Sequence, residues 1–279
     1  MSHFLSLLPV IWPWSILIAA QIAVLSRQQR LGLTLLAVFG GTALGLGLVT
    51  PMAVGIAFLG LLGAAGLRRL NGIAALAGHL ALILWCVALG AHLIPGFHNP
   101  LVLDQVQAGP ASGVFSMHLN LDKPLVLFAV LMAWPAMIRG AVSTKTGPLV
   151  IGFAILPLLF FLGLATDAIR PEAGLPSWWL IFALSNLFLT SLTEEAFFRG
   201  YLQSAFVSIT RPAIGVALAS FLFGLAHIGG GPALVAFASI LGAACGLGYF
   251  ATGRLWVPVL MHFGFNALHL ALFTYPAPA

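Results

Sequence analysis

Uninterrupted apolar runs of roughly 18–22 residues recur along this sequence, and they constrain its fold more than any other feature. Each run, coiled as a helix, is long enough to cross the ~30 Å hydrocarbon layer of a bilayer. Inside that layer the backbone must satisfy its own hydrogen bonds, which only helices and closed barrels can do. The runs lack the alternation of apolar and polar residues that a barrel strand needs. The sequence therefore predicts an all-α fold, a polytopic bundle of transmembrane helices.

Charged residues are too scarce for a soluble globular protein. Only 6% of the 279 residues are charged and 61% are hydrophobic, whereas soluble domains carry about 25% charged residues. A net charge of +5 would suggest nucleic-acid binding in a soluble domain. Here it reflects the loops of a membrane protein, so no nucleic acid is expected. Cys86 and Cys245 both fall within apolar runs, and we expect them to be buried as small apolar side chains.

The apolar runs divide into about ten spans. We expect them at residues 8–26, 31–49, 51–67, 72–95, 124–141, 147–165, 177–200, 212–229, 232–251 and 256–274. If the N-terminus lies outside, the outer loops hold only two basic residues, Lys123 and Arg170. The cytoplasmic loops then hold the other nine: Arg27, Arg30, Arg68, Arg69, Arg139, Lys145, Arg199, Arg211 and Arg254. Because Lys and Arg accumulate in cytoplasmic loops, both termini are predicted on the outer side.

Two carboxylates interrupt the span at 177–200. Glu194 and Glu195 belong to the stretch Ser191-Leu-Thr-Glu-Glu-Ala-Phe-Phe-Arg199-Gly-Tyr201. An ionisable side chain within the bilayer costs at least ~2.5–3.5 kcal/mol, which makes it a functional candidate by default. On a helix, Glu195 and Arg199 form an i,i+4 pair with the acid first, the favourable order. Glu194 points about 100° away from this pair, so it is the stronger candidate for chemistry.

A histidine on the next span is predicted to lie level with Glu194. The segment Thr210-Arg211-Pro212 forms the turn between the two spans, with its proline at a helix start. Glu194 precedes this turn, and His227 follows it, by roughly 24–26 Å of helix. An antiparallel hairpin therefore brings the carboxylate and the imidazole together. This match in depth holds if the segment 200–212 continues as helix beyond the bilayer or lies in a hydrated cavity.

The last span adds His262 and Asn266, which share a helix face at i,i+4 spacing. A carboxylate, two imidazoles and an amide in a site of low dielectric suit hydrolysis. Glu194 can act as a base toward water, and His262 with Asn266 can donate hydrogen bonds to an oxyanion. The carboxylate and the two imidazoles would also suit zinc with water as its fourth ligand. Proton-coupled transporters use intramembrane Glu and His as well, although we find no internal repeat of the transporter kind.

Three motifs, in order on successive spans, resemble those of the CPBP family (CAAX protease and bacteriocin-processing, or Abi), which includes the type II CAAX prenyl endopeptidase, the Ras-converting enzyme. They are Glu194-Glu195-x-x-x-Arg199, Phe223-x-x-x-His227 and His262-x-x-x-Asn266, and the resemblance covers about residues 148–275. It implies an intramembrane endopeptidase. By this resemblance Glu194 and His227 activate the water, His262 and Asn266 form the oxyanion hole, and Glu195 and Arg199 support the site.

The resemblance leaves the catalytic type open, since this family has been described both as metalloproteases and as glutamic proteases. We predict a glutamic protease without a cofactor, because Asn266 suits an oxyanion donor better than a zinc ligand. The alternative is a zinc metalloprotease with Glu194, His227 and His262 as ligands. We divide the chain into residues 1–146, N-terminal transmembrane helices of unassigned role, and residues 147–279, the CPBP-like protease core.

The expected partners are the lipid bilayer and a membrane-anchored protein or peptide substrate. Eukaryotic members of the family cut prenylated CAAX tails. A compact chain with short loops looks bacterial, which favours an inner (plasma) membrane location. A bacteriocin leader or a C-terminal sorting segment then becomes the expected substrate. A proton-coupled transporter that uses the same Glu and His side chains is the alternative function.

Overall fold

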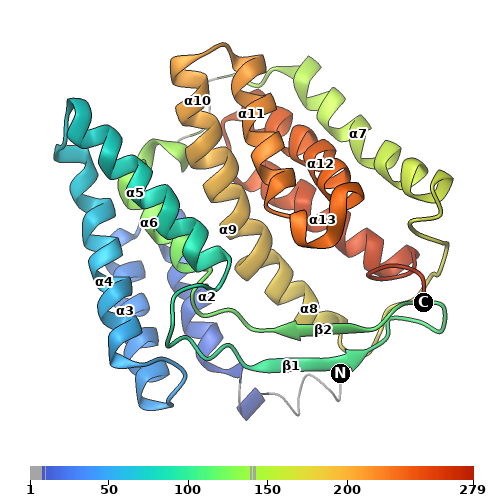
Figure 1. Ribbon diagram of the computed structural model, residues 1–279, viewed down its shortest axis with the longest axis horizontal. Coiled ribbons are helices and arrows are strands. Elements are labelled where there is room, and N and C mark those ends of the chain that lie inside the picture. The colour runs from blue at the N-terminus through green and yellow to red at the C-terminus, as the bar shows by residue number, and fades with distance from the viewer. Residues whose placement is uncertain (1–7, 10, 139, 141–142) are drawn as a thin grey trace. The chain divides into compact units, whose positions relative to one another are not determined.

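The computed structural model describes residues 8–9, 11–138, 140 and 143–279 (Figure 1). Arg139, which we assigned to a cytoplasmic loop, lies outside this described part of the chain. The helices are α2 (Pro13–Leu25), α3 (Gln29–Gly45), α4 (Pro51–Gly66), α5 (Gly72–Gly90), α6 (Leu125–Ala133), α7 (Thr146–Ala165), α8 (Trp179–Leu184), α9 (Leu192–Glu195), α10 (Ser204–Ile209), α11 (Pro212–Leu225), α12 (Gly231–Thr252) and α13 (Trp256–Leu272). The strands are β1 (Leu101–Val106) and β2 (Phe115–His118).

Each of the ten predicted spans contains a helix, and among the described residues five helices are long and apolar enough to cross a bilayer. These five are Pro51–Arg69, Gly72–Gly90, Thr146–Ala165, Trp179–Ile209 and Ile228–Thr252. The chain is therefore a helical protein of the membrane type, as predicted. The helices α2, α11 and α13 are apolar but shorter, and α6 has only 9 residues. The full set of ten spans and the side on which the termini lie stay predictions.

The connection between α5 and α6 contains a β-hairpin that the all-α prediction missed. The strands β1 and β2 form a two-stranded sheet, and the backbone N–H of Leu119 donates to the carbonyl of Pro100 at its open end (3.0 Å). In β1 the apolar residues Val102 and Leu103 are buried, while the polar residues Asp104 and Gln105 are exposed. Strands this short carry too few residues for a pattern that reasoning on apolar runs can detect.

The chain forms two compact units that interleave along the sequence. One comprises residues 1–103, 117–135 and 180–193, and the other comprises residues 104–116, 136–179 and 194–279. These units do not follow the proposed division at residue 146, which stays a prediction. All six predicted site residues belong to the second unit.

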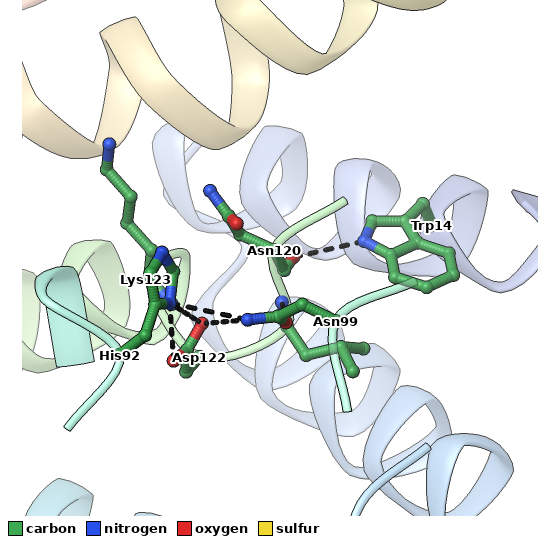
Figure 2. A network of polar contacts seen from close by, with 7 residues as sticks. Trp14, His92, Asn99, Asn120, Asp122 and Lys123 are labelled. Atoms are coloured by element: carbon green, nitrogen blue, oxygen red, sulfur yellow. Dashed lines mark hydrogen bonds and ion pairs between the residues drawn. The ribbon is translucent and has the colours of Figure 1, made fainter. Parts of the chain in front are cut away.

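In the first unit, α2 packs on α3, and α6 packs on α4 and α5. A polar network fastens the end of α5 to the start of α6 (Figure 2). Nδ1 of His92 lies 2.8 Å from Oδ2 of Asp122, a carboxylate that is only 1% exposed. Figure 2 also shows Asn99, whose Nδ2 donates to Oδ1 of Asp122 (3.2 Å). Because these donors satisfy the buried carboxylate, the network stabilises the fold of this unit.

In the second unit, α12 packs against α7, α11 and α13 (Figure 1). Small residues permit this packing, among them those of the stretch Gly242-Ala-Ala-Cys-Gly246 in α12. A Cβ at Gly152 of α7 would lie 2.8 Å from the carbonyl oxygen of Ala244 in α12, so only glycine allows this close approach. By contrast, the glycines at Gly40, Gly41 and Gly45 in α3 face open space. Both cysteines are buried, as expected.

Candidate active site

The two adjacent glutamates lie at the midpoint of one long helix, Trp179–Ile209. Two π-helical segments, Ser185–Ser191 and Ala196–Gln203, flank the single α-helical turn that carries them. Wide turns of this kind recur at functional sites, because they shift side chains onto a new face of the helix. We predicted that this span ends near residue 200, but the helix continues to Ile209. This continuation is one of the two ways in which we expected Glu194 and His227 to lie level.

Arg199 is not a loop cation, as we had assigned it, but a fully buried side chain with 0% exposure. Its Nε lies 3.1 Å from Oε2 of Glu195, which is also fully buried. Its Nη2 donates to the carbonyl oxygen of Gly242 in α12 (3.1 Å). An assignment based on hydropathy puts a charged residue at the end of a span. A buried partner of opposite charge allows the residue to lie within the span instead. Arg199 therefore no longer belongs among the nine basic residues that we assigned to the cytoplasmic loops.

Glu195 also contacts the last helix. Its Oε1 lies 2.9 Å from Nδ1 of His262, which is 3% exposed. An ionised carboxylate only accepts hydrogen bonds, so the N–H at Nδ1 of His262 donates a hydrogen bond to Glu195. The two carboxylate oxygens thus bind two different cations or donors, Arg199 on one side and His262 on the other. Glu195 fixes the orientation of the imidazole and leaves Nε2 as its reactive nitrogen.

His227 lies just past the end of α11, and not inside a helix as the predicted span 212–229 implied. Its Nδ1 donates to the carbonyl oxygen of Phe223 (2.8 Å), because a carbonyl can only accept. This carbonyl is one of the last four in α11, which lack partners within the helix. The half-buried imidazole therefore caps the helix with Nδ1. Its Nε2 remains available to the site when the ring is neutral.

The ring of Phe223 is the common neighbour of both imidazoles and of the buried guanidinium. Its centroid lies 4.8 Å from that of His227 and 5.5 Å from that of His262. Cζ of Arg199 lies over the same ring, 4.4 Å from its centroid. The side chains come from α11, α13 and the segment Ala196–Gln203, so one aromatic ring joins three parts of the second unit. This cluster is the centre of the candidate site.

Glu194 and Asn266 are both half-buried. Glu194 immediately precedes Glu195, and Asn266 lies one turn after His262 on α13. α11 packs on α10 and on Ala196–Gln203, so the predicted helical hairpin is present. The structure thus brings Glu195, Arg199, His227 and His262 together around Phe223. The catalytic roles of Glu194, His227, His262 and Asn266 all stay predictions.

A zinc site at Glu194, His227 and His262 was the alternative reading. Within the described residues, no three His, Cys, Asp or Glu side chains are close enough together to hold a metal ion. Zinc sites of the catalytic kind need three such ligands. These three residues therefore do not form a ready ligand set in this conformation, and we derive no step through a metal.

Sequence reasoning missed the parts played by Phe223 and Gln203. In the sequence, Phe223 had no assigned role beyond being the first residue of the motif Phe223-x-x-x-His227. In the structure its ring contacts both histidines. Nε2 of Gln203 donates to the carbonyl oxygen of Gly246 (2.9 Å), one turn beyond the bond from Arg199 to Gly242. A signal for Gln203 was present, since Glu195, Arg199 and Gln203 recur every four residues along one helix.

The apolar helices of the second unit thus bury a carboxylate, a guanidinium and an imidazole group against one another. Residues 176–268 match the family model described as type II CAAX prenyl endopeptidase Rce1-like. This part of the chain is therefore similar to that family, in agreement with the resemblance noted in the sequence. The matched segment contains all six predicted site residues. Comparisons with curated proteins and with solved structures found no match.

Proposed function

We propose that this protein is an intramembrane endopeptidase in which Glu194 and His227 activate water and His262 with Asn266 hold the oxyanion. The observation that carries the proposal is the way in which both imidazoles are held. Nδ1 of His227 donates to a carbonyl and Nδ1 of His262 donates to a carboxylate. Each ring therefore has Nε2 left for chemistry, and the two rings share one aromatic neighbour.

The different partners of the two histidines favour different roles. Nδ1 of His227 donates to a backbone carbonyl, and its Nε2, when unprotonated, can accept a hydrogen bond from water. Nδ1 of His262 donates to the buried carboxylate of Glu195, and its Nε2, when protonated, can donate to a developing oxyanion. Arg199 lies 3.1 Å from the other oxygen of Glu195 and holds this carboxylate in place. This contrast supports a base-side role for His227 and an oxyanion-side role for His262.

The reaction follows from these roles. Glu194 takes a proton from a water molecule held by His227, and the hydroxide attacks the carbonyl carbon of the scissile peptide bond. Negative charge that develops on the carbonyl oxygen is stabilised by His262 and by the amide of Asn266. When the tetrahedral intermediate collapses, the C–N bond breaks and the proton held by Glu194 passes to the leaving amine. This scheme needs no metal ion, and zinc remains the alternative to be tested.

The substrate is proposed to be a membrane-anchored protein or peptide that is cut in a C-terminal or juxtamembrane segment. The name of the matched family points to a prenylated C-terminal tail. In a bacterial inner membrane, where we propose that this chain resides, a bacteriocin leader or a C-terminal sorting segment is the counterpart. A proton-coupled transporter that uses the same Glu and His side chains stays the alternative function.

The test is peptide cleavage by the purified protein in proteoliposomes, with products identified by mass spectrometry. Candidate substrates are a farnesylated CAAX peptide and a membrane-anchored leader peptide. Glu194→Gln should abolish cleavage, because the amide keeps the shape of the side chain and loses its basicity. Asp104→Asn, the same change at an exposed carboxylate in β1, is the matched control and should cleave normally.

Three results would count against the proposal. Cleavage that persists in Glu194→Gln would remove the general base. The wild type could contain stoichiometric zinc that is lost in Glu194→Gln, and a chelator could inhibit the wild type. These two observations together would replace the glutamic mechanism with a metal-dependent one. Proton-coupled uptake without cleavage of either peptide would favour the transporter.

A further inference from the structure

We infer that Phe223 is a positioning residue for the reaction, because its ring fixes both imidazoles and the guanidinium that supports them. The inference goes beyond the proposed function and rests on it, since it concerns the same site. The ring is fully buried, at 0% exposure. It contacts His227 in a tilted arrangement (53°) and His262 in an edge-to-face arrangement (87°).

The ring of Phe223 itself packs against another aromatic ring. Phe198 contacts it edge-to-face, with centroids 5.1 Å apart, and Phe197 contacts Phe198 in the same manner. The backbone beside it is fixed as well, because α11 crosses α12 closely at Gly224. A Cβ at Gly224 would lie 2.6 Å from the carbonyl oxygen of Val235. Because the ring is held in this way, it restricts the positions of the side chains that it contacts.

The ring and the backbone carbonyl of Phe223 make different contacts in the site. The carbonyl of Phe223 accepts from Nδ1 of His227, and a substitution leaves this carbonyl in place. His262 depends on Glu195 for its hydrogen bond and contacts Phe223 only through the ring. A substitution that removes the ring therefore leaves both imidazoles with their hydrogen-bond partners. It removes the aromatic ring that contacts both of them.

Precise placement of these imidazoles matters for rate more than for substrate binding. A misplacement of about 1 Å in a catalytic group can cost on the order of 100-fold in rate. We therefore expect Phe223→Leu, a change to an apolar side chain without a ring, to lower kcat by about 10–100-fold. KM should stay within about 2-fold, because Phe223 is fully buried.

The first measurement does not depend on activity. Protein labelled with ¹⁵N-histidine in liposomes is examined by solid-state NMR, with His227 and His262 assigned from His→Ala variants. In the wild type, both rings should show a protonated Nδ1, and His227 a single tautomer. In Phe223→Leu, the signals of both rings should shift or broaden, with a mixture of tautomers at His227. Unchanged signals would overturn the inference whether or not the protein is a protease.

The second measurement compares kcat for three variants. Phe39→Leu is the matched control, because Phe39 is a buried ring (4% exposed) that contacts Trp14 in the first unit. It should keep kcat within about 2-fold. Phe223→Tyr keeps the ring and should recover most of the activity lost in Phe223→Leu. Wild-type kcat in the leucine variant, or equal losses in the leucine and tyrosine variants at equal thermal stability, would overturn the inference. If the wild type cleaves no peptide, the proposed function fails while the NMR test of positioning still stands.

Discussion

Replacing Arg199 by methionine would remove one member of a buried ion pair while keeping most of the side-chain volume. Arg199 and Glu195 are both fully buried, and 3.1 Å separates Nε from Oε2. Breaking such a pair leaves an uncompensated charge and costs about 3–5 kcal/mol of stability. About 1 kcal/mol corresponds to a shift of roughly 2–4 °C in Tm for a domain of 150–250 residues. We therefore expect Arg199→Met to lower Tm by roughly 6–20 °C.

The double variant Glu195→Gln/Arg199→Met tests whether charge is the cause. It removes both charges, so no buried ion is left without its partner, and it should be more stable than Arg199→Met alone. The assay is thermal unfolding in one lipid nanodisc preparation, followed by the fluorescence of the 7 tryptophans. Coupling between contacting residues is expected at about 0.5–3 kcal/mol. A Tm shift below about 2 °C in Arg199→Met, or strictly additive effects in the cycle, would refute the reasoning.

Three further predictions concern single positions. Asn266→Ala should retain weak cleavage, with kcat reduced about 10²–10³-fold, because one oxyanion donor is lost; wild-type kinetics would remove that role. Gly224→Val should destabilise the protein by about 1–3 kcal/mol, because its side chain would meet the backbone of α12. Gly40→Val, which faces open space, is its control in the same thermal melts. Asp122→Asn should lower stability by about 1–3 kcal/mol, because hydrogen bonds to a buried charge are lost. Its kcat should be unchanged, because this network contains none of the proposed catalytic residues, and a slower reaction would contradict that separation.

Local spacing was enough to predict the helices and one part of the site. The apolar runs predicted helices at every expected span, and the i,i+4 spacing predicted the pair of Glu195 and Arg199, which the structure contains. The contact between Glu195 and His262 could not be predicted in this way. These residues are 67 positions apart, and their contact depends on how α13 packs in the second unit.

Two errors have the same physical origin. Arg199 was assigned to a loop because hydropathy treats every charge as if it faced water, and the span was ended at that point for the same reason. The partners that make burial possible, Glu195 and the carbonyl of Gly242, become visible only in three dimensions. The position of His227 was missed differently. A histidine that caps a helix with Nδ1 has the same spacing to Phe223 as one inside the helix.

The polar series Glu195, Arg199 and Gln203 connects the folding of the second unit to its chemistry. Without water in the bilayer core, each buried polar group must find a partner within the protein. Glu195 finds His262 on α13, while Arg199 and Gln203 find carbonyl oxygens one turn apart on α12. A slide of α12 along this helix would leave two donors unsatisfied, and a rotation of α13 would break the contact with Glu195. The requirement that makes the chain helical thus also fixes the register in which His262 meets the site.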